Sequence, residues 1–243
     1  QRIMSHGSLG AGEAYMDGWW DCERLDMLFD RILLFQLNRA FQSISDLQLV
    51  LSARLQNLQK PARADAVACT HYDLSPELYR VMLDKRMIYS CGYWPHARDL
   101  DQAQEAKLHL ICRKLGLQAG MTLLDIGCGW GGAARFAAEN YDVSVTGITI
   151  SSEQARFAVD TCQGLPVEII TGDYRSLTGH FDRIMSIGMF EHVGYKNYRT
   201  YFKIARKLLD PEGLFLLHTI GSNVSNLSTD TWIEKYIFPN SML

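Results

Sequence analysis

A glycine-rich loop between an apolar strand and a helix most strongly constrains this fold. Residues 123–132 read LLDIGCGWGG, and the alanine-rich run that follows has helical character. Glycine lets the backbone turn sharply and approach a ligand closely, where a Cβ atom would collide. The sequence therefore predicts a strand–loop–helix element that binds a nucleotide-like ligand.

Two residues near this loop argue against NAD as the ligand. The pattern G-x-G-x-x-G alone is a weak indicator of a dinucleotide. Asp125 precedes the glycines, and a carboxylate there suits a cofactor with a cationic amino acid and a sulfonium. The next strand ends in Thr149, whereas dinucleotide folds place an acid there for the ribose. The spacing resembles motif I of S-adenosylmethionine-dependent methyltransferases.

Strands and helices alternate regularly from residue 121 onward. The hydrophobic pattern predicts strands at 121–126, 143–150, 167–171, 181–187 and 213–219. It predicts helices at 101–116, 132–139, 151–162 and 196–209. Such alternation is typical of an α/β fold with a parallel sheet wrapped by helices.

The N-terminal part has a different pattern. We expect a small helical domain at residues 1–60, a linker at 61–70, and a catalytic domain at 71–243, with the first and last of these incomplete. Apolar residues at helical spacing should form the core of the first domain. They are Leu25, Leu28, Phe29, Ile32, Leu33, Phe35, Leu47, Val50, Leu51 and Leu55.

Composition excludes several classes of function. A net charge of −3 and a pI near 6.2 lack the excess of positive charge that is typical of nucleic-acid-binding proteins. No apolar run is long enough to span a bilayer. The six cysteines are scattered without a CxxC pair, which argues against a structural zinc site and for a reducing cytosol. We therefore expect no metal site and a cytoplasmic protein.

Ligands of parallel sheets bind beyond the C-terminal ends of the strands, so residues that leave the strands are candidates for function. Glu191 follows an apolar strand and could bind a cation, accept a proton, or only cap and pair locally. His218 ends another apolar strand, where it is either a structural or a functional residue. The aromatic segment 89–94 is either core packing or a lid over adenosine and an apolar substrate. No spacing activates Cys91 as a nucleophile.

Several motifs together carry a specific family resemblance over nearly the whole chain. They are His71-Tyr72-Asp73, Met87–Trp94, Leu124–Gly132, Gly147–Ser151, Asp173-Tyr174-Arg175, Gly188–Gly194 and Leu217–Gly221. The chain resembles cyclopropane-fatty-acyl-phospholipid synthases and the related mycolic acid cyclopropane synthases. Residues 8–20 resemble the bacterial phospholipid enzymes, which carry an N-terminal domain before the catalytic one.

The resemblance implies a class I methyltransferase fold, with a Rossmann-like and mostly parallel sheet, that transfers a methylene group to carbon. The π electrons of a cis double bond in a phospholipid acyl chain attack the sulfonium methyl group of S-adenosylmethionine. A carbocation forms, bound bicarbonate removes a proton from the new methyl group, and a cyclopropane ring closes. By resemblance, bicarbonate is held by Cys91, Glu191, His218 and Ile220, and Cys91 is then a positioning residue.

The resemblance also implies the cofactor contacts and the partners. The implied contacts to S-adenosylmethionine are Tyr89, Ser90, Leu124, Asp125, Gly127, Gly129, Gly131, Thr149, Ile150, Gln154, Tyr174 and Arg175. We expect an unsaturated membrane phospholipid as the substrate and peripheral attachment to the inner face of the cell membrane. No nucleic-acid partner is expected, and a homodimer is left open.

One departure and two alternatives stay open at this point. The family continues past the segment that resembles residues 232–240, and the sequence ends at Leu243. By resemblance, the continuation supplies a tyrosine of the bicarbonate site, much of the acyl-chain pocket and the last sheet strands. The alternatives are a methyltransferase that acts on a nitrogen or oxygen of a small molecule, and a non-catalytic lipid-binding or dimerisation module.

Overall fold

The computed structural model describes residues 2–35, 76–221, 223 and 230–237. The chain divides into two compact units, one of residues 1–58 with 222–243 and the other of residues 59–221. The predicted linker at 61–70, the motif at 71–73 and the apolar residues predicted at 47–55 lie outside the described residues. The predicted domain boundaries stay a prediction.

The larger unit contains a parallel five-stranded sheet in the order β3-β2-β1-β4-β5. The strands are β1 (Thr122–Ile126), β2 (Ser144–Thr149), β3 (Val167–Thr171), β4 (Phe181–Ile187) and β5 (Leu209–His218). The chain winds outward from β1 to β3 and then returns to the other side of β1 at β4. The predicted α/β class I methyltransferase fold is confirmed, and this reversal places the expected binding site at the C-terminal ends of β1 and β4.

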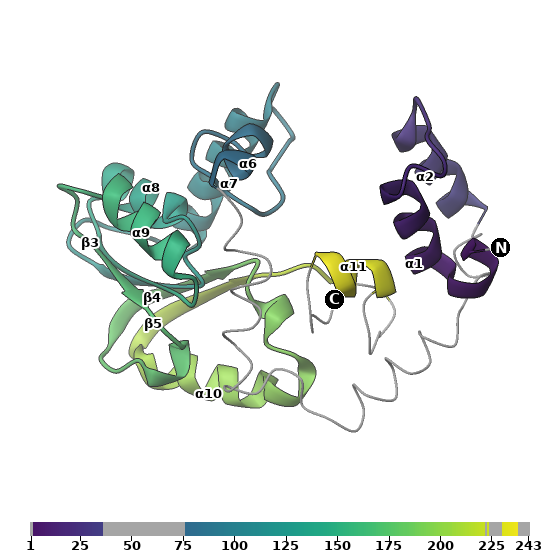
Figure 1. Ribbon diagram of the computed structural model, residues 1–243. Helices are drawn as coiled ribbons and strands as arrows, with labels where there is room; N and C mark the ends of the chain where they lie inside the picture. Colours follow the sequence, from purple (N-terminus) through teal and green to yellow (C-terminus); the bar gives the residue numbers. More distant parts are fainter. Residues whose placement is uncertain (1, 36–75, 222, 224–229, 238–243) are drawn as a thin grey trace. The chain divides into compact units, whose positions relative to one another are not determined.

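Helices cover both faces of this sheet. In Figure 1, α8 and α9 lie on one face and α10 lies on the other. The larger unit contains α6 (Pro76–Met82), α7 (Leu100–Lys114), α8 (Gly132–Tyr141), α9 (Ser152–Thr161), α10 (Tyr198–Leu208) and the short 3₁₀ helices η3 (Tyr174–Ser176), η4 (Phe190–His192) and η5 (Tyr195–Asn197).

Two predicted boundaries were wrong near the end of this unit. The helix predicted at 196–209 is divided into η5 and α10. The strand predicted from 213 begins at Leu209, because Leu209 already pairs with Phe181 of β4 before an irregularity in the register. Cross-strand pairing of this kind depends on the neighbouring strand, so local sequence patterns do not reveal it.

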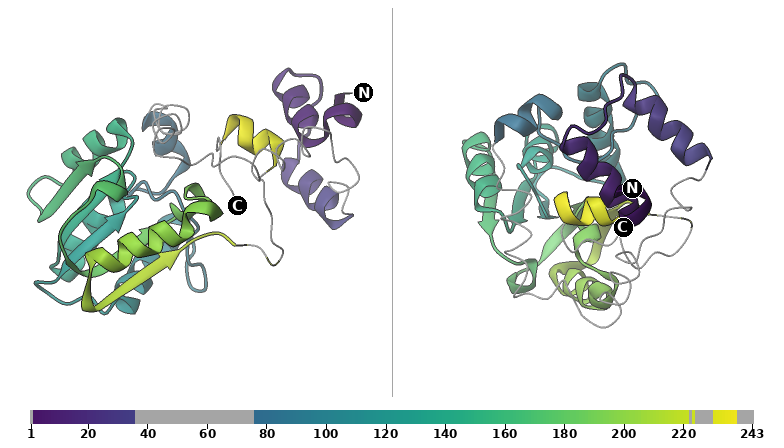
Figure 2. Two further views of the ribbon diagram at one scale, coloured as in Figure 1. Left: turned by 90° about the horizontal axis from the view of Figure 1, so that it is seen from below. Right: turned by 45° about the vertical axis from the view of Figure 1, so that its right-hand side comes forward.

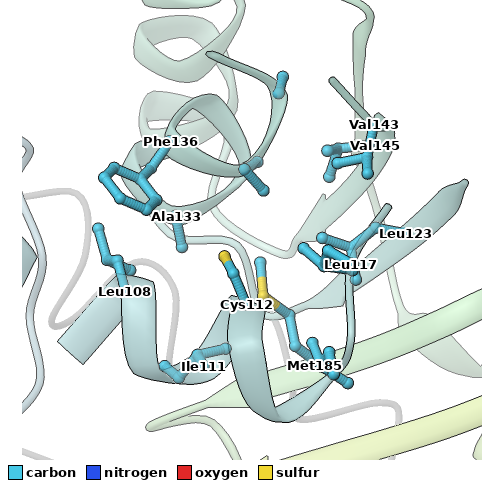
Figure 3. Close-up of a cluster of buried hydrophobic side chains, with 14 of the residues drawn as sticks. Leu108, Ile111, Cys112, Leu117, Leu123, Ala133, Phe136, Val143, Val145 and Met185 are labelled. Carbon is cyan, nitrogen blue, oxygen red and sulfur yellow. The ribbon is translucent and has the colours of Figure 1, made fainter. Parts of the chain in front are cut away.

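The hydrophobic core lies in two layers on the two faces of β1. Leu123 packs with residues of α7 and α8 in the cluster shown in Figure 3, which includes Leu108, Phe136 and Met185. The next residue, Leu124, belongs to the opposite cluster, which contains Tyr201 of α10. Consecutive strand residues point to opposite faces, so a strand covered on both sides carries apolar residues toward both faces. This burial fixes the strand ends that carry the site.

The smaller unit contains α1 (Arg2–Met16), α2 (Leu25–Leu34) and α11 (Thr231–Tyr236). Glycine at position 12 allows α1 to approach α11 closely, because a Cβ atom there would lie 2.2 Å from the Trp232 ring. Glu13 accepts hydrogen bonds from Lys235 at 2.6 Å and from Arg2 at 2.7 Å. Figure 2 shows α1, α2 and α11 from two further directions.

The expected core of the first domain stays a prediction, because part of it lies outside the described residues. No residue of α2 is buried, and Phe29, Leu33 and Phe35 are 53%, 61% and 70% exposed. Helical periodicity predicts which face would be buried, but burial also needs a second surface. No described residue supplies a surface that buries α2. In the described part of the chain, no helix is both long and apolar enough to cross a membrane.

Candidate active site

The glycine loop joins β1 to α8 at the switch point of the sheet. Gly127, Gly129 and Gly131 have φ angles of 89°, 53° and 81°, which L side chains rarely adopt. Cβ atoms at Gly127 and Gly131 would lie 2.6 Å and 2.7 Å from Met189 and Ala158. At Gly129 the nearest atom to such a Cβ is Nε2 of Gln154, at 4.0 Å. Gly129 therefore faces open space, whereas its two neighbours in the motif face packed protein.

Asp125 is buried at the end of β1, directly before these glycines. It is 2% exposed, and burial raises its pKa to about 7. Its Oδ2 atom has no hydrogen-bond partner among the described residues. A buried carboxylate oxygen without a partner is costly, and a cationic ligand group would relieve that cost.

Hydrogen bonds fix the turn from β2 to α9. Thr149 Oγ1 donates to Gln154 Oε1 at 2.9 Å, and both side chains are buried. The main-chain N–H of Gln154 donates to Ser151 Oγ at 3.2 Å, so Ser151 caps α9. The structure thus brings together two of the predicted cofactor residues, Thr149 and Gln154, with Ile150 between Thr149 and the cap.

The turn after β3 holds its charged residue differently. Arg175 forms a bidentate ion pair with Asp173, which also caps η3 through the main-chain N–H of Arg175 at 2.9 Å. The ring of Tyr174 packs against Tyr201, with 5.3 Å between the centroids. The Arg175 guanidinium is therefore engaged locally, and the predicted contacts of Tyr174 and Arg175 with a cofactor stay predictions.

The segment from Ile88 to Cys91 lies against α7. Gln104 Nε2 donates to the carbonyl oxygen of Ser90 at 2.7 Å and to that of Ile88 at 3.3 Å. Lys107 Nζ donates to Ser90 Oγ at 2.7 Å. Tyr89 is 40% exposed and packs edge-on against Tyr79, so part of its ring faces solvent.

The predicted catalytic residues converge from three parts of the unit. Cys91 Sγ lies 3.6 Å from His218 Nε2, and the N–H of Ile220 donates to Glu191 Oε1 at 2.7 Å. The N–H of Gly188 donates to the carbonyl oxygen of His218 at 2.9 Å and so joins the ends of β4 and β5. Glu191 forms no ion pair with any described residue, which disfavours the salt-bridge alternative for this side chain.

This convergence leaves two buried polar atoms without partners. Glu191 Oε2 and His218 Nδ1 have no hydrogen-bond partner among the described residues. Burial, and then the charge of Lys107, lowers the pKa of His218, so its imidazole is neutral at neutral pH. The arrangement can therefore bind a small polar ligand through one carboxylate acceptor and one neutral imidazole. No group of three or more His, Cys, Asp or Glu in the described ranges is arranged to hold a metal ion.

Sequence reasoning missed Gln104 and Lys107. Both occupy the buried stripe of α7 together with Ala103, Leu108 and Ile111. A polar residue at a position of the apolar stripe of a helix indicates a buried hydrogen-bonding group, because a polar group is buried only where it has a partner. That signal was present in the sequence, although it could not name Ser90 as the partner.

Comparison with known protein families identifies the family of the chain that carries this site. Residues 59–243 match the family described as mycolic acid cyclopropane synthetase. The chain belongs to this family. The resemblance inferred from the sequence is therefore confirmed.

Curated members and relatives of the mycolic acid cyclopropane synthetase family match the chain over long segments. The chain is 55% identical over 244 residues to the cyclopropane-fatty-acyl-phospholipid synthase of Escherichia coli K12, which covers 100% of this chain and 64% of that enzyme. It is 44% identical over 168 residues to cyclopropane mycolic acid synthase 1 of Mycobacterium tuberculosis H37Rv, covering 66% of this chain and 57% of that protein. The chain thus spans less than two thirds of these relatives.

Solved structures share the fold. The cyclopropane synthase MmaA2 from Mycobacterium tuberculosis has a TM-score of 0.67 at 36% identity, covering 73% of this chain and 68% of that one. The mycolic acid cyclopropane synthase CmaA1 complexed with SAH and CTAB has a TM-score of 0.61 at 40% identity, covering 63% and 55%. A coclaurine N-methyltransferase, at 24% identity and a TM-score of 0.64 over 85% of this chain and 60% of that one, shows the fold alone.

Proposed function

We propose that the protein transfers a methylene group from S-adenosylmethionine to the cis double bond of an unsaturated acyl chain in a membrane phospholipid, and so forms a cyclopropane ring. The observation that carries the proposal is the convergence of Cys91, Glu191, His218 and Ile220. Gly127 of the glycine loop lies against Met189, two residues before Glu191. Family membership and the 55% identity to the Escherichia coli enzyme support it. A methyl transfer to nitrogen or oxygen needs no such cluster.

The loop after β1 fits S-adenosylmethionine. The open side of Gly129 leaves room for close approach of a ligand to the backbone, and the unpartnered Oδ2 of Asp125 suits a cationic amino group. When bound, the cofactor would supply an electrophilic methyl group. Thr149, Gln154 and the Tyr89–Ser90 pair would complete its binding site, with Leu124, Gly127, Gly131, Ile150, Tyr174 and Arg175 as the remaining proposed contacts.

The cluster around Glu191 fits bicarbonate. Glu191 Oε2 can accept a hydrogen bond from a hydroxyl group, and the imidazole of His218 can donate one to an oxygen. When bound, bicarbonate would supply the base for the proton that leaves the new methyl group. The chain's part is to orient that ion: the Ile220 amide fixes the Glu191 carboxylate, and Cys91 fixes one edge of the His218 ring. Glu191 is only 7% exposed, whereas Ile220 is 63% exposed and Cys91 is exposed as well, so the described residues shield the carboxylate from water more than the rest of the cluster.

We also propose peripheral attachment to the inner face of the cell membrane. Trp19 is 68% exposed, and Phe29 and Leu33 of α2 and the following Phe35 are more than half exposed. Exposed aromatic and aliphatic side chains can enter the boundary between head groups and acyl chains. The described cysteines are all free thiols, which supports the cytoplasmic side. A homodimer stays a prediction.

Lipid mass spectrometry of cells that express the full-length gene tests the proposal. We expect unsaturated phospholipids to gain the mass of one CH₂ group and to lose their double bond. A gain of CH₂ with the double bond retained, or methylation of a small amine or alcohol instead, would contradict ring formation and favour an ordinary methyltransferase. S-adenosylmethionine binding without any lipid product would favour the non-catalytic lipid-binding module.

A further inference from the structure

The side chain of Lys107 is buried in the body of the larger unit. The residue is only 4% exposed, although it carries an ammonium group. Lysine is almost never fully buried unless a partner offsets its charge. Lys107 therefore requires a structural or functional explanation.

No carboxylate among the described residues forms an ion pair with Lys107. Its Nζ donates to the neutral Ser90 hydroxyl at 2.7 Å, and it forms no ion pair with any described residue. Burial lowers its pKa to about 8, while Cys91 and Asp84 act in the opposite direction. The ammonium thus keeps its proton at neutral pH, and the described residues leave its charge without a direct counter-ion.

The field of this charge reaches the candidate active site. Ser90, its hydrogen-bond partner, is the residue before Cys91. The pKa of His218 is lowered by burial and then by the charge of Lys107. Lys107 is therefore linked to the Cys91–His218 pair through Ser90 and through its charge.

The charges of the site explain what such a cation can do. Glu191 forms no ion pair with any described residue, and its Oε2 has no hydrogen-bond partner there. A second anion beside it is disfavoured because two like charges in a low-dielectric site repel. We propose that Lys107 is a positioning residue whose buried ammonium allows the pocket of Cys91, Glu191 and His218 to retain an anion. It acts through Ser90 and through its charge, without touching the substrate. This inference rests on the proposed use of bicarbonate.

Gln104 has a separable part in the same arrangement. It holds the main chain of Ile88 and Ser90, and the N–H of Tyr93 donates to the carbonyl oxygen of Ala103 at 2.9 Å. These contacts position the backbone of the segment even without Lys107. Loss of the Lys107 charge should therefore change anion binding more than the fold.

The test measures the bicarbonate requirement of the full-length enzyme on vesicles of unsaturated phospholipid in carbonate-depleted buffer. Lys107→Met removes the charge and keeps the length, Lys107→Arg keeps the charge, and Arg113→Met removes an exposed cation from the same helix. We expect Lys107→Met to raise the half-saturating bicarbonate concentration roughly ten- to thirtyfold, the order expected for one unit charge several ångströms away in a partly buried site. Arginine should restore most of this affinity, and Arg113→Met should behave as the parent.

The outcomes separate this inference from the proposed function. A parent enzyme that ignores bicarbonate overturns the proposed base itself. A parent that requires bicarbonate together with an unchanged requirement in Lys107→Met overturns only the role of Lys107, as does an equal loss in the Met and Arg variants that appears in kcat alone. If Lys107→Met fails to fold, Ser90→Ala decides: it should raise the requirement by a smaller factor, and an unchanged requirement contradicts the inference.

Discussion

The main-chain amide of Ile220 donates a hydrogen bond of 2.7 Å to Oε1 of Glu191. This contact joins the segment after β5 to η4, which follows β4, and it holds the carboxylate in one orientation. The second oxygen, Oε2, remains buried and unpartnered among the described residues. Glu191 thus uses one oxygen for structure and presents the other to the site.

Replacement of Glu191 by glutamine should separate these two uses. In Glu191→Gln the amide oxygen can still accept from Ile220, but an NH₂ donor replaces the Oε2 acceptor. We expect S-adenosylmethionine affinity to stay close to that of the parent and phospholipid turnover to fall by about 10²- to 10⁴-fold, as for displaced acid–base groups. Calorimetry and a lipid assay with and without added bicarbonate measure the two effects. Near-normal turnover that does not depend on bicarbonate would show that Glu191 is structural.

Two glycines of the loop should respond differently to the same substitution. Gly129→Val places a side chain in open space at a positive φ, so the cost to the fold should be about 1–2 kcal/mol, while cofactor binding is lost. Gly131→Val drives a side chain into Ala158 and should destabilise the fold more strongly. Thermal unfolding and calorimetry with S-adenosylmethionine distinguish them. Unchanged cofactor affinity in Gly129→Val would remove the loop from the binding site.

Cys91 should not act as a nucleophile. Its thiol lies 3.6 Å from His218 Nε2, and by resemblance Cys91 is a positioning residue. We expect Cys91→Ala to lower turnover no more than about tenfold, whereas loss of a covalent nucleophile costs many orders of magnitude. Steady-state assays of the full-length variant measure this. Complete loss of activity in a folded Cys91→Ala protein would favour covalent catalysis.

Cofactor affinity should depend on pH through Asp125. Burial raises the pKa of this carboxyl to about 7, so the free protein carries it partly protonated at neutral pH. A cationic amino group binds the ionised form, so affinity should rise as the pH increases through about 7, and binding should release protons below that pH. Calorimetry in buffers of different ionisation enthalpy measures the release. Asp125→Asn should bind weakly at every pH, and a pH-dependent affinity in that variant would assign the titration to another group.

The same shift gives a stability prediction with a definite sign. The folded pKa of Asp125 is raised above its ordinary value near 3.8. The contribution of Asp125 to the free energy of unfolding is therefore fully present below pH ~4 and is lost as the pH rises from there through about 7. In Asp125→Asn this decline in the free energy of unfolding should disappear. Urea unfolding of the cofactor-free proteins across this range tests it, and parallel pH profiles for parent and variant would contradict it.

Membrane binding should depend on Trp19 more than on Trp20. Trp19 is 68% exposed, whereas Trp20 donates from its indole to the carbonyl oxygen of Ala11 at 3.1 Å. Trp19→Ala should weaken co-sedimentation of the full-length protein with liposomes and leave thermal stability unchanged, while Trp20→Ala should lower stability. If the parent fails to pellet with liposomes of any composition, peripheral attachment is wrong.

The sequence by itself determined the order of the strands and helices and the ligand loop. Alternating apolar runs with turn residues between them are local signals, and strands β3 and β4 have the predicted limits. Asp125 and the glycines also form a local signal, because their chemistry depends on residues within one turn of the chain. The family resemblance rested on several such motifs together, and for that reason it was more specific than the loop alone.

The tertiary structure decided which side chains meet. Cys91 and His218 are 127 residues apart, and their contact follows from the packing of α7 and from the pairing of β4 with β5. The partner of Lys107 could not be read from its helix, because a stripe shows which residues are buried and not what they face. Helix α2 shows the converse, since its helical periodicity was predicted correctly and yet none of its residues is buried by the described part of the chain. Periodicity is a property of one segment, whereas burial, hydrogen bonds and shifted pKa values require a second segment in a fixed place.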